Sequence, residues 1–140
     1  MSNKKTDESP GPITREFPRP QWTEFFDSFS RRHDGWLVTI EVVGPELGAQ
    51  TQGQDLRLRG ISLDTAEASR ISIMLETLSV EHLTHMIDRP THIWLEQTSD
   101  GADMALLIES AEDIRTIIRF QSPMRPEQVD GVMAAESPIK

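Results

Sequence analysis

The chain has no cysteine and no tyrosine among its 140 residues. The lack of cysteine excludes a zinc ribbon, an iron–sulfur protein, a thiol enzyme and a disulfide-stapled scaffold. Long apolar runs are also missing, so no segment is expected to cross a bilayer as a helix. The polar N-terminus lacks the apolar stretch that a secretory signal needs. These absences predict a soluble, cytoplasmic domain.

Positive charge is scarce. Lys and Arg number 14 against 23 Asp and Glu, which gives a net charge of −9 and a pI of about 4.8. Nucleic-acid binding through a broad basic surface is therefore disfavoured, because phosphate neutralisation needs clustered Lys and Arg. Glycine-rich phosphate loops and the Gly-x-Ser-x-Gly elbow of serine hydrolases are also missing, so neither a nucleotide enzyme nor a serine hydrolase is expected.

Proline marks the two ends of the chain. Seven of the nine prolines fall in the first 20 and the last 18 residues, whereas apolar residues concentrate between them. Segments of low apolar content cannot offset their ordering entropy. We therefore expect a disordered arm over residues 1–18, a single α+β domain over residues 19–123 and a disordered tail over residues 124–140.

The spacing of four aromatic residues predicts a helix over residues 21–32. Trp22, Phe25, Phe26 and Phe29 fall on one stripe at helical period. Pro20 suits the first helical position, and Gly35 follows as a stop signal.

Period-two patterns then predict six or seven short strands. They cover residues 36–43, 55–64, 69–76, 91–98, 103–109 and 114–120. A polar loop is expected over 48–53 and a bulge at Gly60. Residues 79–87 fit either an extended segment, which the alternation favours, or a short helix. The order indicates an antiparallel meander that forms a small barrel or a curled sheet behind an N-terminal amphipathic helix.

The predicted strands are apolar on both faces, although a one-sided sheet shows water a polar face. The second face carries Leu37, Val43, Met74, Trp94, Ala105, Leu107 and Ile117. We expect part of this face to be covered, either by the aromatic helix or by a second subunit.

Histidines are the remaining candidates for metal or proton chemistry. His82, His85 and His92 are candidate metal ligands. His82 and His85 would share one side of a helix but lie on opposite faces of a strand. His33, beside Asp34, fits either a general base held by a carboxylate or a cation favoured at a helix C-terminus.

A binding surface has more support from the sequence than a reaction site. Its candidate residues are Trp36, Trp94, Leu107, Ile117, Arg115 and Arg119. Arginines alternating beside an aromatic side chain could grip an anionic or single-stranded ligand. Alternatively, they pair with the surplus acidic residues on neighbouring strands, which is the interpretation we favour.

Two stretches resemble a family of short bacterial proteins known as domain of unknown function 5335. The first contains Trp22, Phe25, Phe29, Ser30-Arg31-Arg32-His33 and Gly35. The second contains His82-Leu83-Thr84-His85, Pro90, Ile93-Trp94-Leu95-Glu96 and Gly101. The resemblance covers roughly residues 15–122. It implies a bacterial source and a small single-domain architecture, and it brings no activity, cofactor or catalytic residue.

We therefore expect a non-enzymatic binding or assembly module with no cofactor. Its partner would be another protein or a second copy in a homodimer. A histidine- or metal-dependent small enzyme is the alternative, and a barrel that binds single-stranded nucleic acid is the weaker one.

Overall fold

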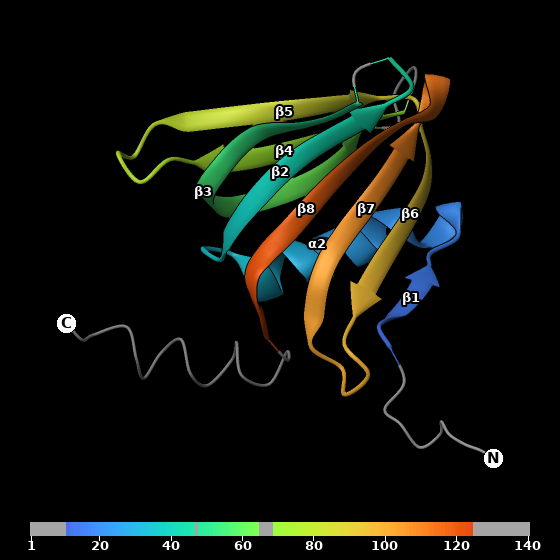
Figure 1. Ribbon diagram of the computed structural model, residues 1–140, viewed down its shortest axis with the longest axis horizontal. Coiled ribbons are helices and arrows are strands. Elements are labelled where there is room, and N and C mark those ends of the chain that lie inside the picture. Colours follow the sequence, from blue (N-terminus) through green and yellow to red (C-terminus); the bar gives the residue numbers. More distant parts are fainter. Residues whose placement is uncertain (1–10, 47, 65–68, 125–140) are drawn as a thin grey trace.

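The computed structural model describes residues 11–46, 48–64 and 69–124, which form one helix packed on one antiparallel sheet (Figure 1). The helix is α2 (Trp22–His33), preceded by a 3-10 turn, η1 (Arg19–Gln21). The strands are β1 (Ile13–Glu16), β2 (Leu37–Gly44), β3 (Gly48–Asp64), β4 (Arg70–Glu76), β5 (His82–Asp88), β6 (Pro90–Gln97), β7 (Asp103–Ser110) and β8 (Ile114–Met124). A second 3-10 turn, η2 (Ala111–Asp113), joins β7 to β8. The α+β class is confirmed.

The eight strands lie in the order β1-β6-β7-β8-β2-β3-β4-β5. The sheet is curled, but it does not close into a barrel, because the edge strands β1 and β5 do not pair with each other. Of the two predicted forms, the barrel is therefore wrong and the curled sheet describes the structure. The strand count also exceeds the predicted six or seven.

The aromatic stripe of α2 forms as predicted. Its buried residues are Trp22, Phe25, Phe26, Phe29 and His33, and they face the concave side of the sheet. Ser30 fixes the helix to β3, because its hydroxyl donates to the Ile61 carbonyl at 3.2 Å and accepts from the Ile61 N–H at 2.9 Å. Gly35, at φ +91°, makes the turn from the helix into β2.

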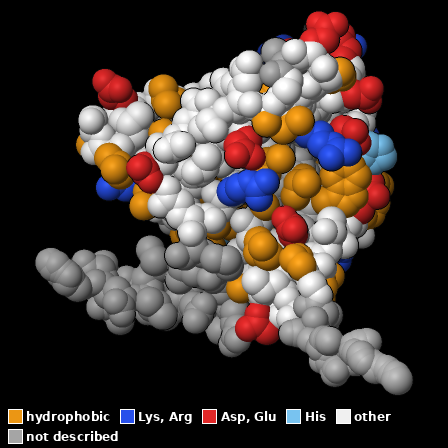
Figure 2. All heavy atoms as spheres, in the orientation of Figure 1, with side chains coloured by type: hydrophobic (Ala, Val, Ile, Leu, Met, Phe, Trp, Pro, Cys, Tyr) orange, Lys and Arg blue, Asp and Glu red, His pale blue; other side chains and the backbone are white. Residues whose placement is uncertain are grey.

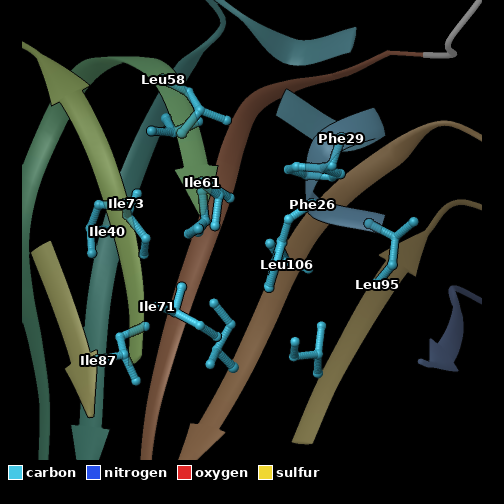
Figure 3. Packing of buried hydrophobic residues seen from close by; sticks show 14 of the residues in the cluster. Phe26, Phe29, Ile40, Leu58, Ile61, Ile71, Ile73, Ile87, Leu95 and Leu106 are labelled. Atoms are coloured by element: carbon cyan, nitrogen blue, oxygen red, sulfur yellow. The ribbon is translucent and has the colours of Figure 1, made fainter. Parts of the chain in front are cut away.

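The core lies between α2 and the concave face (Figure 3). Fully buried residues that line it include Val38 and Ile40 on β2, Ile73 on β4, Ile93 on β6 and Leu106 on β7. Along β2, β4, β6 and β7 the buried residues alternate with more exposed ones, as a pleated sheet requires. The core therefore lies on one face of the sheet.

Two predicted boundaries are wrong. Residues 48–53, expected as a loop, are the first part of β3 and pair with β2. Residues 13–16, expected within the disordered arm, are β1 and pair with β6. In both stretches the side chains are mainly exposed and the order comes from backbone pairing. Because no face of these stretches is buried, their sequences show no alternation of apolar and polar residues. The bulge is confirmed, because the β3–β4 register shifts between Leu58 and Gly60.

The helix covers the opposite face from the one that we expected. It fills the concave side, so the second apolar face of the sheet is its convex side, and on that side Leu37 and Met74 are each 37% exposed. Residues 1–10 and 125–140, most of the predicted arm and tail, lie outside the described residues. Over the described residues no helix has the length and apolar content to span a membrane.

Candidate functional site

Three apolar side chains form a row across the convex face. Trp94 on β6 is paired with Leu107 on β7, and Leu107 is paired with Ile117 on β8. Their neighbours along each strand point into the core, since Ile93, Leu106 and Ile118 are fully buried. We call Trp94, Leu107 and Ile117 the outer row. Directly opposed side chains of adjacent strands touch, so the three residues make one continuous apolar surface.

The outer row is only partly covered. All three side chains have intermediate exposure, and α2 lies behind the sheet on the other face (Figure 1). Figure 2 shows this face, where apolar side chains are interspersed with basic and acidic ones. The sequence predicted these three residues as part of an interaction surface, and the structure places them side by side on the convex face.

Ion pairs flank the outer row. Arg119 Nε lies 3.3 Å from Glu41 Oε1, and Arg115 Nε lies 3.9 Å from Glu109 Oε2. Both arginine side chains are about half exposed, at 51% and 54%. The arginines therefore pair with acidic residues across neighbouring strands, which is the interpretation that the sequence favoured.

Trp94 is held in place from the β1 edge. The His92 ring stacks on it, with 5.3 Å between ring centroids and 17° between ring planes. Nδ1 of His92 is hydrogen-bonded to Glu16 Oε2 at 2.8 Å. The stacked His92 ring and its bond to Glu16 therefore fix the orientation of the Trp94 indole at the surface.

Trp36 does not belong to this surface, contrary to the prediction. It is 6% exposed and packs edge-on against His33 and Phe120. It comes directly before β2, where the chain leaves α2, so its side chain turns into the core. Its indole Nε1 is buried and has no hydrogen-bond partner within the described ranges of the chain.

The three histidines proposed as metal ligands do not converge. His82 and His85 lie on strand β5 and so on opposite faces of the sheet, whereas His92 lies on β6 beside Glu16. Within residues 11–46, 48–64 and 69–124, no three His, Asp or Glu side chains are placed to hold a metal ion. The extended form favoured for residues 79–87 is confirmed over residues 82–87, whereas residues 79–81 precede the strand and belong to the connection from β4.

His85 lines a groove on the inner side of β5. A hollow of about 280 Å³ lies between His85, Ile87 and the β7–β8 connection, and a second of about 200 Å³ lies toward Leu75 and Leu83. Burial lowers the pKa of His85, because desolvation disfavours the charged imidazolium. The sequence indicated only that this histidine would face away from His82.

One buried polar pair was missed by sequence reasoning. His33 Nε2 lies 2.7 Å from Asp103 Oδ2, and both side chains have no exposed surface. Burial raises the pKa of Asp103, but the hydrogen bonds from His33 and Gln97 and the nearby positive charges outweigh it, so the pKa lies below its usual value. The predicted neighbour, Asp34, instead lies 3.4 Å from Arg59. Neither member of the buried pair can reach a substrate in this conformation.

Comparison with known proteins gives a family. The model of the "Family of unknown function (DUF5335)" matches residues 13–129. An "Uncharacterized protein" of Aquifex aeolicus (strain VF5) is 29% identical over 108 residues, covering 77% of this chain and 92% of the relative. No solved structure matches the chain significantly.

Proposed function

We propose that this chain, which belongs to the family of unknown function DUF5335, is a non-enzymatic module that binds another protein through the outer row. The observation that carries the proposal is the register of Trp94, Leu107 and Ile117 on three adjacent strands. A contiguous apolar surface rimmed by polar residues is typical of a protein–protein contact site. Tryptophan and arginine are also the residue types enriched at such sites.

The charges around the outer row favour a protein over a nucleic acid. Arg115 and Arg119 each have an acidic neighbour, so the surface has alternating charge instead of a basic stripe. A polyphosphate ligand would have to compete with Glu41 and Glu109 for these guanidinium groups. A partner with an apolar centre and charges of both signs would meet complementary groups.

A histidine-dependent enzyme has less support. His85 lines a groove, and in the part of the chain that the structure describes its ring is not hydrogen-bonded to a nucleophile or to a second base. The metal version can be tested by elemental analysis of protein purified without a histidine tag. Stoichiometric zinc, iron or manganese would support it over the binding module.

The proposed function is tested with Trp94→Ala. Tagged full-length chain captures partners from cells of its own source, and the captured protein is purified and titrated against the chain by calorimetry. Loss of a central tryptophan costs about 2 kcal/mol or more at an interface, so Kd should rise about thirtyfold. Hydrogen exchange of the complex should show protection on β6, β7 and β8.

The matched control is Leu78→Ala, which truncates a side chain that is 55% exposed and lies away from the outer row. It should leave Kd unchanged. Equal affinity of the wild type and Trp94→Ala, or protection confined to other strands, would overturn the proposal.

A further inference from the structure

The two edges of the sheet differ in how well they are protected. β1 is four residues long and carries Arg15 and Glu16. A short, charged edge strand is one of the ways in which proteins prevent unwanted strand pairing. β5 is seven residues long and has neither lysine nor proline. It pairs with β4 in continuous register from Arg70–Asp88 to Glu76–His82, without a bulge.

Apolar side chains are exposed on both faces of β5. Leu83 is 45% exposed on the concave side, and Met86 is 46% exposed on the other side. Among the residues that the structure describes, β5 has one sheet neighbour, β4, so half of its backbone N–H and C=O groups point away from the sheet. A regular edge strand with exposed apolar side chains and no lysine or proline is a template for another strand.

The part of β5 whose outward backbone groups can pair with another strand ends at Asp88. The Arg89 N–H donates to the Ser69 carbonyl at 3.0 Å, and the Arg89 carbonyl accepts from the Ala111 N–H at 3.1 Å. These bonds join the chain to its own fold directly after Asp88. An added strand therefore has residues 82–88 to pair with.

We propose that a second copy of this chain pairs with that edge, β5 to β5 and antiparallel, with the twofold axis at His85. In this register His82 faces Asp88 of the second copy, and Leu83 faces Ile87. Both ends then bring a histidine beside a carboxylate, and the concave face gains two apolar pairs. The sheet would continue across the axis through both molecules.

Other registers are poorer. Directly opposed residues of paired strands lie on the same face of the sheet. In any allowed register, Leu83, His85 and Ile87 of one copy must therefore lie opposite residues of the same set in the other copy. If the twofold axis moves by half a residue, Leu83 lies opposite Met86, and these two side chains are on different faces of the sheet. If the axis moves by a whole residue, Val80 lies opposite Asp88 in one direction, and Leu83 lies opposite Arg89 in the other. The register centred on His85 places a histidine opposite a carboxylate and apolar side chains opposite apolar ones.

The inner groove is consistent with this arrangement. Ile87 lines the hollow of about 280 Å³, and Leu83 lines the hollow of about 200 Å³. Leu83 of the second copy would cover Ile87, and the twofold axis repeats the contact. The surface differs from the outer row, so this inference holds independently of the proposed function.

A single introduced cysteine tests the register, since the chain contains no other. Residues that are directly opposed in antiparallel strands have Cα atoms about 4.5–5.5 Å apart, within the range of a disulfide. The full chain carrying His85→Cys should therefore form a covalent dimer under mild oxidation. Ser99→Cys, in an exposed turn, is the matched control and should remain monomeric. Equal crosslinking of both variants would overturn the proposal.

Sedimentation equilibrium gives the second measurement. His82→Glu places like charges opposite each other at both ends, so the dimer Kd should rise about tenfold. Adding Asp88→Lys to His82→Glu restores opposite charges and should restore dimerisation. Leu78→Lys adds a charge outside the strand and should have no effect, and circular dichroism checks that each variant is folded. A monomeric wild type at millimolar concentration, or failure of the double variant to recover, would contradict the proposal.

Discussion

His33 on α2 and Asp103 at the start of β7 share a buried hydrogen bond of 2.7 Å, although 70 residues separate them in sequence. Nδ1 of His33 lies 2.8 Å from the Phe29 carbonyl, which can only accept, so Nδ1 carries a proton. The pKa of Asp103 is below its usual value, so the carboxylate is ionised and the proton on its hydrogen bond belongs to Nε2. The pair is therefore an imidazolium and a carboxylate inside the core.

Removing the histidine should destabilise the protein strongly. His33→Leu leaves the Asp103 carboxylate buried with the Gln97 amide at 2.7 Å and the Arg32 guanidinium at 3.7 Å. Breaking a buried ion pair by removing one partner costs about 3–5 kcal/mol. Urea denaturation should show this loss in the free energy of unfolding. His92→Leu is the control, because its exposed pair with Glu16 should contribute about 1 kcal/mol or less. Similar losses in both variants would contradict the assignment.

The pH dependence of stability should identify the charge state of this pair. The pKa of Asp103 is lower in the folded chain than the ordinary pKa of an aspartate carboxyl group. Asp103 therefore contributes fully to the free energy of unfolding at any pH above its pKa in the unfolded chain. This contribution is lost as the pH falls through the lower pKa that Asp103 has in the folded chain. The wild type should lose this contribution only below about pH 4, as measured by urea denaturation at a series of pH values.

Asp103→Asn should move that loss to higher pH. The asparagine amide would donate to Nε2, which requires a neutral imidazole. An unfolded histidine titrates near pH 6.5, so acidification below about 6.5 would favour unfolding of the variant. Its stability should therefore fall as pH is lowered from about 7 to 5. Parallel profiles for the two proteins would show that the pair is not ionic.

Ser30 should be needed to fix α2 on the sheet. Ser30→Ala removes the hydroxyl that both donates to and accepts from the backbone of Ile61. Leaving buried backbone groups without a partner costs about 1–3 kcal/mol, and thermal denaturation should report this loss. Ser30→Thr keeps the hydroxyl and should recover part of it. A melting temperature unchanged in Ser30→Ala would contradict this role.

The three tryptophans should differ in their access to solvent. Trp22 and Trp36 are 1% and 6% exposed, whereas Trp94 has intermediate exposure. Acrylamide should therefore quench mainly Trp94, and Trp94→Phe should remove most of the quenchable fluorescence. Trp36→Phe serves as the comparison and should leave the quenchable fraction in place. The reverse result would show that the convex face is covered in solution.

The predictable parts of the fold are those that leave a side-chain pattern. Four aromatics at helical spacing predicted α2, and apolar alternation predicted most of the strands. β1 and the first part of β3 left no such pattern, because backbone pairing orders them while their side chains stay in solvent. The same reasoning grouped Trp94, Leu107 and Ile117 on one face, since alternation assigns faces within a sheet.

By itself, the sequence determined the class of fold, the buried aromatic stripe of α2 and the lack of thiol chemistry. The tertiary structure decided which face α2 covers, and so which apolar residues remain outside. It also decided that His33 is paired with Asp103 instead of Asp34, that Trp36 is buried, and that β5 is an edge. These features depend on which strands become neighbours, and neighbours are chosen by packing between segments far apart in the chain, which local periodicity does not encode.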